Sequence, residues 1–137
     1  MLRVIEPKHL AAEWERVRAG LLEVKKATTD DWLPEDVYMA LRQAQASLYI
    51  GTGAAGEYLG FVVLRLLPTF HGSKVEVWCA HSATKKPALR AFLPHIKAIA
   101  ANNGATRIGF SSARPEWAAA AVRLGFTPKQ VSYELTL

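Results

Sequence analysis

The stretch from Tyr58 to Leu67 constrains the fold more than any other part of the sequence. It is almost wholly apolar and rich in valine, leucine and aromatic side chains. Successive strand residues point to opposite faces of a sheet, so a run of this kind belongs to a strand that is buried on both faces. We therefore expect a central strand in a sheet that is flanked by helices.

Further strands are predicted on both sides of this run. Ser47–Ile50 precedes it across the glycine-rich turn Gly51–Gly56, and an alternating segment, Lys74–Ala80, follows it. Alternation with a period of two is typical of a strand. We expect the three strands to form a consecutive antiparallel meander over Leu48–Ala80. The third strand is expected to place Val75, Val77 and Cys79 on one face and Glu76, Trp78 and Ala80 on the other.

Two helices are predicted ahead of the meander. The first carries an apolar stripe at spacings of three and four residues, which is the period of a helix. The second starts at Leu33 and Pro34, because proline fits the first turn and the acids after it favour the positive end of the helix dipole. The first stripe is Leu10, Trp14, Val17, Leu21 and Val24, and the second helix is expected to turn inward Val37, Leu41 and Ala44.

A helix, a strand, a short helix and a last strand are predicted after the meander. The first of these helices ends at Asn102–Gly104, and its regular part begins near Arg90 or later, because Pro94 is tolerated only in a first turn. Its apolar stripe is Leu89, Phe92, Leu93, Ile96 and Ile99. The strand covers Arg107–Phe110, and the short helix opens at Pro115. The last strand is predicted from the alternation of Val131, Tyr133, Leu135 and Leu137.

The length of 137 residues fits one α/β domain over residues 1–137. With half of its residues hydrophobic and 21% charged, the chain has the composition of a globular protein. The sequence shows neither the ~20 apolar residues of a membrane span nor the apolar stretch of a secretory signal, so we expect no membrane partner. Its single cysteine, Cys79, excludes an internal disulfide and favours a cytoplasmic location.

The net charge of +5 favours a polyanionic partner or a phosphorylated ligand. The basic residues are scattered over several predicted elements, whereas a nucleic-acid binder clusters them on one face. Nucleic acid is therefore not expected as a partner. The four histidines lack the spacing of metal ligands, so no metal is predicted.

The order of the predicted elements resembles the GNAT (Gcn5-related N-acetyltransferase) fold. The local match is Pro115–Phe126, which resembles the family's last helix with its closing Gly-Phe pair. Glycine supplies the left-handed residue after the helix, and phenylalanine covers the end of the core. The resemblance implies an acyl-CoA N-acyltransferase fold, in which a mixed central sheet with an antiparallel meander is flanked by helices. It also implies transfer of an acetyl group from acetyl-CoA to an amine.

The same resemblance assigns a cofactor site and a base. Glu76 lies in the strand that often carries the general base, and it would deprotonate the amine directly or through a water. By its position alone, Glu76 also fits a solvent-facing carboxylate. Lys85 and Lys86, two lysines in a turn, also fit a solvated loop. The residues implied for acetyl-CoA are Val77, Trp78 and Cys79 for its pantetheine arm and Lys85, Lys86 and Arg90 for its phosphates.

Two features of the family's pattern are missing. The phosphate-binding loop has small residues where this chain has Pro87 and Leu89, which removes an N–H donor and places a branched side chain in the path of the phosphates. The tyrosine that protonates the leaving thiolate corresponds to Ala121, and an asparagine seven residues earlier corresponds to Arg114. We therefore expect weak binding of acetyl-CoA and little or no turnover with simple amines.

Two hypotheses follow from the sequence. One is an acetyltransferase acting on a small-molecule amine or a protein. The other is a GNAT-fold protein without catalysis, for which a likeness to small proteins of tailed phages suggests a virion component. Cys79 and His81 share a strand face, but no third group completes a nucleophile pair, so a buried, inert thiol is predicted. Tyr133 fits the core better than the role of a proton donor.

Overall fold

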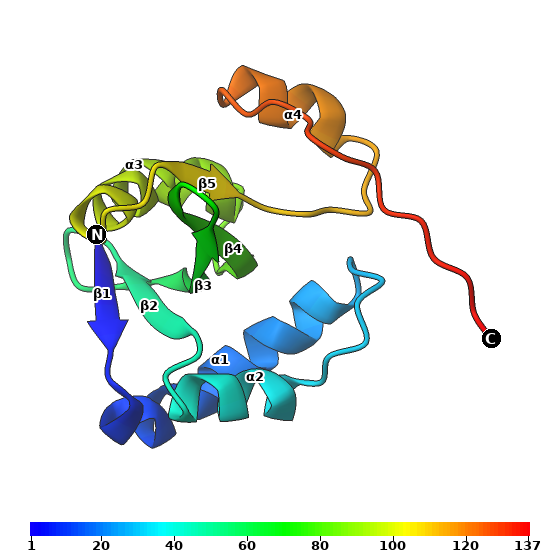
Figure 1. The fold of residues 1–137 in the computed structure, drawn as a ribbon. Coiled ribbons are helices and arrows are strands. Elements are labelled where there is room, and N and C mark those ends of the chain that lie inside the picture. Colours follow the sequence, from blue (N-terminus) through cyan, green and yellow to red (C-terminus); the bar gives the residue numbers. More distant parts are fainter.

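The computed structural model describes residues 1–137 and contains a five-stranded sheet with helices packed on it (Figure 1). None of the helices combines the length and apolar character that a bilayer crossing requires. In chain order the elements are β1 (Leu2–Ile5), the 3₁₀ helix η1 (Pro7–His9), α1 (Leu10–Lys25), α2 (Pro34–Arg42), β2 (Ser47–Thr52), β3 (Tyr58–Thr69), β4 (Gly72–Ser82), α3 (Ala88–Asn102), β5 (Arg107–Gly109) and α4 (Trp117–Arg123).

The strands lie in the sheet in chain order, β1-β2-β3-β4-β5. β1 to β4 pair antiparallel, and β5 pairs parallel with β4. The antiparallel meander predicted over Leu48–Ala80 is therefore confirmed, and so is the central place of the apolar run in β3. Parallel pairing of β4 with β5 is possible because α3 carries the chain back between them.

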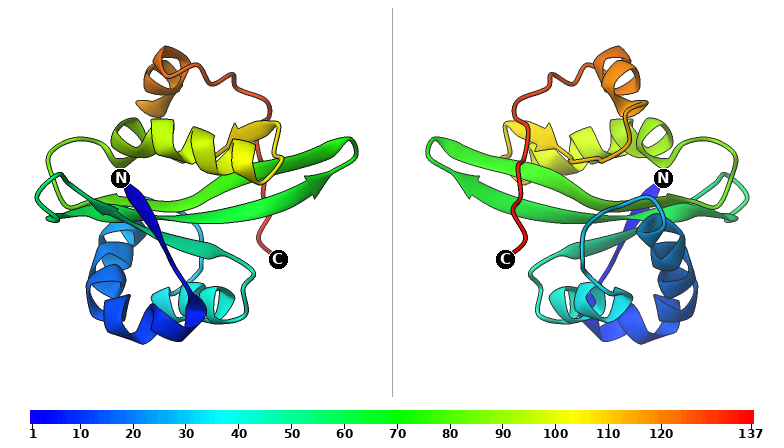
Figure 2. Two further views of the ribbon diagram at one scale, coloured as in Figure 1. Left: turned by 90° about the vertical axis from the view of Figure 1, so that its left-hand side faces the viewer. Right: turned by 90° about the vertical axis from the view of Figure 1, so that its right-hand side faces the viewer.

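The two faces of the sheet are covered by different helices. α1 and α2 lie on one face, the α1–α2 side, and α3 and α4 lie on the other, the α3 side (Figure 2). β3 contributes to the buried clusters on both faces, with Phe61 and Val63 on the α1–α2 side and Val62 and Leu64 on the α3 side. None of these four side chains is more than 4% exposed, as expected of a strand covered on both faces.

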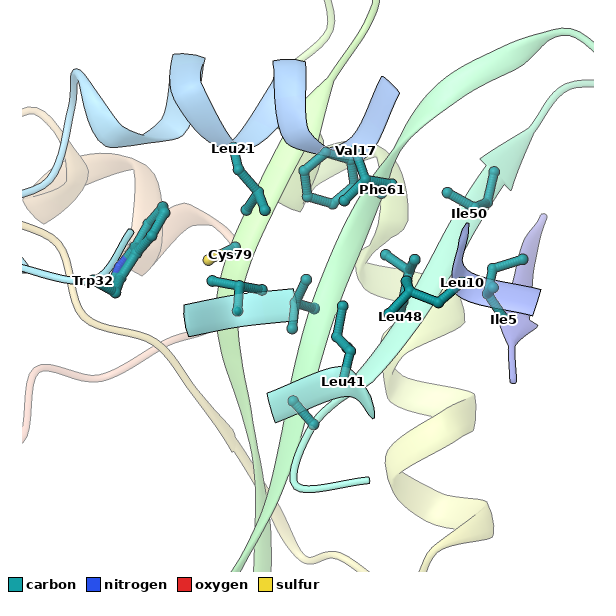
Figure 3. Close-up of a cluster of buried hydrophobic side chains, with 13 residues drawn as sticks. Ile5, Leu10, Val17, Leu21, Trp32, Leu41, Leu48, Ile50, Phe61 and Cys79 are labelled. Carbon is teal, nitrogen blue, oxygen red and sulfur yellow. The ribbon is translucent and has the colours of Figure 1, made fainter. Parts of the chain in front are cut away.

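α1 packs on the sheet through the predicted apolar stripe. The buried members of the stripe are Leu10, Val17 and Leu21 (Figure 3), and the partly buried members are Trp14 and Val24. Gly20 lies on the same side of the helix, where an added Cβ atom would stand 2.5 Å from Cε1 of Phe61. The helix therefore approaches the sheet at a distance that only glycine permits.

α2 begins at Pro34, as predicted, and buries Val37 and Leu41. The expectation for Ala44 is wrong. The helix ends at Arg42, and Ala44 is exposed with a φ of 57° in the turn that leads to β2. A left-handed residue cannot continue a helix, so the apolar stripe stops one turn earlier than the sequence indicates.

α3 begins earlier than predicted. It starts at Ala88 rather than near Arg90, and Pro94 lies in its interior. Pro94 is exposed on the solvent side, while Leu93 and Ile96 beside it are buried against the sheet. Burial of the apolar stripe therefore outweighs the hydrogen bond that Pro94 cannot donate to the carbonyl of Arg90.

The prediction of a last strand is wrong. The C-terminal segment, residues 127–137, pairs with no strand and runs clear of the sheet (Figures 1 and 2). Its alternating apolar residues Val131, Tyr133, Leu135 and Leu137 have relative exposures of 73%, 92%, 83% and 112%. Tyr133 is therefore not a core residue. Alternation identifies a sequence that can form a strand, but a strand also needs an edge to pair with.

Candidate functional site

A β-bulge interrupts β4 beside the predicted base. Val63 pairs with Cys79, but the next residue, Leu64, pairs with Val77, so that Trp78 is an extra residue in β4. A bulge can place two successive side chains on one face of the sheet. Trp78 and Cys79 both pack on the α1–α2 side, whereas Val77 packs on the α3 side. The predicted alternation is therefore wrong from Cys79 onward.

β4 and β5 separate immediately beyond Glu76. The last residue pair between them joins Glu76 to Gly109, where β5 ends. From Val77 to Ser82, β4 has a neighbouring strand only on the β3 side, and we call the open space beside it the split. This part of β4 spans about 20 Å at the rise of an extended strand. Its backbone N–H and C=O groups on the open side can pair with an extended ligand.

The carboxylate of Glu76 lies at the closed end of the split and is bound by Arg65. The two residues are directly opposed in the register of β3 and β4. Arg65 Nε donates to Glu76 Oε1 at 3.0 Å, and Nη2 of the same guanidinium contacts the same oxygen. The guanidinium also lies 4.2 Å from the ring centroid of Trp78. Charge-assisted hydrogen bonding and stacking thus hold the carboxylate in place.

Trp32 extends this cluster on the α1–α2 side. Its ring packs edge-on against Trp78, with centroids 6.4 Å apart, and Lys25 Nζ lies 5.2 Å from its centroid. Trp32 is 8% exposed, and its Nε1–H has no acceptor within the chain. A buried donor without an acceptor destabilises the fold, and an acceptor atom of a ligand would relieve that penalty.

Sequence reasoning did not identify Arg65 or Trp32. The signal for Arg65 lies in the hairpin, because a two-residue turn at Phe70 and His71 brings Arg65 opposite Glu76. Turn length fixes the register of an antiparallel pair, so this contact could have been derived. Trp32 has no comparable signal, since it lies between α1 and α2 in a segment without a periodic pattern.

The basic residues predicted to meet phosphates lie at the open end of the split. Lys85 and Lys86 belong to the loop between β4 and α3, and Arg90 lies in the first turn of α3. A hydroxyl group braces this loop, because Thr84 Oγ1 accepts the backbone N–H of Lys86 at 3.2 Å. The three basic side chains are exposed, and none forms an ion pair within the chain.

The start of α3 suits an anion better than the sequence indicates. The expectation that Leu89 obstructs the phosphates is wrong, because its side chain is 4% exposed and packs in the core on the α3 side. Pro87 is the residue that precedes the helix, so it removes only one of the four free N–H groups of a helix end. The N–H groups of Ala88, Leu89 and Arg90 have no backbone acceptor.

Cys79 and His81 serve packing rather than nucleophilic chemistry. Burial raises the pKa of the Cys79 thiol to about 12, so the thiol stays protonated, in agreement with the inert cysteine predicted from the sequence. Burial lowers the pKa of His81, whose ring lies 5.5 Å from that of Phe61. No three His, Cys, Asp or Glu side chains are placed to hold a metal ion. The side chains of Val77 and Cys79 are buried, which leaves their backbone to meet a ligand.

α4 provides no proton donor at the position that the resemblance marks. Ala121 lies in this helix, and its methyl group cannot donate a proton. Arg114 lies ahead of the helix and pairs with Glu116, with Nε 2.9 Å from Oε1. Tyr133, the other candidate donor, belongs to the exposed C-terminal segment. The chain therefore combines a helix start with free N–H groups, an open strand edge and a fixed carboxylate, without an acid in α4.

Several solved structures are similar to this chain, although no protein-family model and no curated protein matches its sequence. An aminoglycoside acetyltransferase from an uncultured soil metagenomic sample has a TM-score of 0.70 at 15% identity, with 100% of this chain and 97% of that chain covered. A ribosomal-protein-alanine N-acetyltransferase from Brucella melitensis biovar Abortus 2308 has a TM-score of 0.73 at 14% identity, with 100% of this chain and 99% of that chain covered. An acetyltransferase from Trypanosoma brucei has a TM-score of 0.65 at 17% identity, again with 100% of this chain and 99% of that chain covered.

The likeness to these enzymes extends over the whole chain and is a likeness of fold. None of the three is described as a phage protein, so the narrower likeness to phage proteins stays a prediction. The antiparallel meander, the parallel β5 beyond it and the helices on both faces agree with the architecture that the sequence resembles. The chain has the fold of the GNAT acetyltransferases.

Proposed function

We propose that the protein binds acetyl-CoA in the split and transfers the acetyl group slowly to an amine. The observation that carries this proposal is the pairing of two features along one stretch of β4. The open side of Val77–Ser82 offers an extended row of backbone groups, and the free N–H groups at the start of α3 follow it in the chain. Acetyl-CoA has two matching parts, an arm with amide groups and a diphosphate.

The chain would hold these two parts by different means. The backbone of β4 would pair with the amides of the arm as it would with an added strand. The N-terminus of α3 would hold the diphosphate, because its N–H groups and the helix dipole favour an anion. Lys85, Lys86 and Arg90 add three positive charges at the same end. Because Leu89 points into the core, it leaves this end of the helix accessible.

The reaction requires two proton movements, and the chain supports one of them. When bound, the thioester supplies an activated acyl group with a thiolate as the leaving group. The amine nitrogen forms a bond to the carbonyl carbon, the carbon–sulfur bond breaks, one proton leaves nitrogen and one reaches sulfur. Glu76, at the closed end of the split, would accept the first proton once a substrate has displaced Arg65. Because Ala121 offers no acid in α4, solvent would have to protonate the sulfur. The reaction then lacks the rate acceleration of about 10²–10⁴ that a general acid provides.

The site favours a cationic amine as acceptor. An ammonium group can replace the guanidinium of Arg65 at Glu76, because both are cations that donate hydrogen bonds to a carboxylate. The rings of Trp78 and Trp32 beside it add cation–π attraction. Two of the similar structures are, by their names, acetyltransferases for an aminoglycoside and for the alanine of a ribosomal protein, and both of those acceptors carry amines.

Thermal unfolding in the presence of acetyl-CoA tests the binding part of the proposal. Ligand at about 100 times its Kd should add about 2.7 kcal/mol of stability. Combining Lys85→Ala, Lys86→Ala and Arg90→Ala should remove most of the stabilisation. A matched control removes the same number of charges from exposed positions elsewhere, namely Arg42, Lys97 and Arg123. Absence of stabilisation in the unmodified protein would contradict acetyl-CoA binding.

Thiol release from acetyl-CoA tests the catalytic part, with polyamines, aminoglycosides and lysine peptides as acceptors. Glu76→Gln should lower the acceptor-dependent rate by about 10²-fold or more, because it removes the base. Arg65→Met should raise the rate, since it frees the carboxylate while an apolar side chain still covers Trp78. A rate that is unchanged in Glu76→Gln would exclude Glu76 as the base.

A GNAT-fold protein that binds without turnover is the second candidate. Two observations favour it, because both oppose catalysis: the alanine at position 121 and the ion pair that holds Glu76. In this case the partner is a protein rather than a small amine. The expected result is then no thiol release with any amine, whether or not acetyl-CoA stabilises the fold.

A further inference from the structure

The C-terminal segment presents an uncovered strand face. Its apolar side chains, at positions 131, 133, 135 and 137, alternate with Ser132, Glu134 and Thr136, and all of them are exposed. Four apolar side chains along one side of an extended chain form a face that folded proteins normally cover. Here the segment runs away from the body of the molecule (Figure 1).

β5 presents the complementary feature, an open sheet edge. It is the outermost strand and pairs with β4 alone. The outward N–H and C=O groups of such an edge can accept an incoming strand. Ile108 in β5 packs in the core on the α3 side, so an apolar strand beside it would extend that core.

The chain leaves α4 beside the end of β5. Phe126, which precedes the C-terminal segment, packs edge-on against Phe110 with ring centroids 5.0 Å apart. Phe110 directly follows β5. The segment of one copy therefore starts next to its own β5, and it reaches the β5 of a second copy when the two edges lie side by side.

Pro128 opposes closure of the segment on its own chain. In the structure the segment runs away from the sheet (Figure 1), so pairing with its own β5 would require the chain to turn back between Phe126 and Val131. Pro128 has a fixed φ and keeps Thr127 extended. In the structure this stretch is not folded back onto the sheet (Figure 1). A stiff hinge of this kind favours exchange of a terminal strand between copies.

The charges of the two parts also match. Lys74 and Arg107 are paired in the β4–β5 register, and neither forms an ion pair within the chain. Their neighbours in the strands, Val75 and Ile108, pack on the α3 side, so Lys74 and Arg107 face the other side. If the apolar side chains of the segment join Ile108, alternation brings Glu134, the only acid of the segment, to the side of these two cations.

We propose that two copies of the chain form a two-fold dimer by exchanging their C-terminal segments, each of which adds as a strand to β5 of the other copy. Each copy donates one segment and one edge, so the pair is closed and neither β5 edge stays open. The partner that covers this apolar face is thus a second copy of the chain. This proposal does not depend on acetyl-CoA.

The mass of the protein in solution tests the dimer. Light scattering or sedimentation should show a dimer for the full chain and a monomer for a chain truncated after Gln130, because only exposed residues are removed. Tyr133→Asp should also give a monomer. Val4→Asp, which alters an exposed apolar residue at the opposite sheet edge, should stay dimeric. A monomeric full chain, or a truncated chain that is still a dimer, would overturn the proposal.

Charge reversal distinguishes exchange from closure on the same chain. Glu134→Lys and Arg107→Glu should each weaken the dimer about tenfold, because the dimer contains the pair twice. A 1:1 mixture of the two variants should recover the dimer, since each reversed side chain then meets the opposite charge on the other copy. A segment that docks on its own β5 gains nothing from mixing, so a mixture that dimerises no more tightly than either variant alone would overturn the exchange.

Discussion

At the scale of single residues, Gly20 sets the distance between α1 and the sheet. A Cβ atom at this position would stand 2.5 Å from Phe61 and 2.8 Å from His81, closer than packed side chains approach. Phe61 is fully buried and has no room to move aside. The close approach of helix and sheet therefore depends on the absence of one methyl group.

Gly20→Ala should lower the free energy of unfolding by about 1–3 kcal/mol. Overpacking of the core has this magnitude, and it exceeds the gain of about 1 kcal/mol that alanine gives to a helix. Urea unfolding followed by circular dichroism measures the change. Ala19→Gly, on the exposed side of the same helix, is the control and should lose about 1 kcal/mol from helix propensity alone. A Gly20→Ala protein more stable than its parent would mean that α1 moves to accept the methyl group.

The half-buried imidazole of His81 should make stability depend on pH. Burial lowers its pKa, and Glu23 opposes the shift. A histidine in the unfolded chain titrates near pH 6.5, so below that pH the unfolded state binds a proton that the folded state resists. The contribution of neutral His81 is present above about pH 6.5 and is lost as the pH falls through the lower folded pKa.

We therefore expect the free energy of unfolding to fall between about pH 7 and pH 5, and His81→Gln to remove part of that fall. Urea unfolding at each pH gives the slope. His71→Gln, at an exposed histidine of the β3–β4 turn, is the control and should keep the slope of the parent. Equal slopes in His81→Gln and the parent would exclude His81 as the source.

At the scale of elements, α3 carries an internal defect. Pro94 lies inside the helix on its solvent side, so the carbonyl of Arg90 lacks its usual donor. Pro94→Ala should supply that donor and raise the free energy of unfolding by about 1–3 kcal/mol, as measured by thermal melting. Pro87→Ala, just ahead of the helix, should change it by less than about 1 kcal/mol. Destabilisation by Pro94→Ala would indicate that the helix geometry at Pro94 is itself needed for packing.

The elements that could be predicted are those whose pattern agrees with their burial. The stripe of α1 and the run in β3 follow from periodicity alone, because each face they predict is covered in the structure. The start of α3 could not be predicted in this way, since local preference at Pro94 is overruled by burial of Leu93 and Ile96. The bulge at Trp78 has no periodic signal, because one extra residue only shifts the pattern after it.

At the scale of the whole molecule, the candidate site depends on how distant segments meet. The sequence places Glu76 in the correct strand, but its ion pair depends on the register of β3 against β4. Leu89 is buried, as its place in the apolar stripe of α3 predicts, but whether it also stands in the path of the phosphates depends on where α3 starts, so that obstruction could not be judged from the sequence. The lysines of the loop between β4 and α3 are evident from the sequence, whereas the end of β5 at Gly109 is not.

The excess of positive charge should make acetyl-CoA binding sensitive to salt. The chain carries a net charge of +5, and the residues proposed for the phosphates are exposed. Raising the ionic strength from about 0.01 to 1 M shortens the screening length from about 30 to 3 Å, so the affinity should fall about tenfold or more. Calorimetric titration at several salt concentrations measures this dependence. An affinity independent of salt would place the phosphates away from these side chains.

The four tryptophans are distributed unevenly between the two faces of the sheet. Trp14, Trp32 and Trp78 all pack on the α1–α2 side, and Trp117 alone packs on the α3 side, in contact with Phe110 at a centroid distance of 5.2 Å. Three of the four indoles therefore lie in one layer of the molecule. A variant that keeps only Trp117 would instead act as a local optical probe for the movement of α4 and of the hinge that follows it.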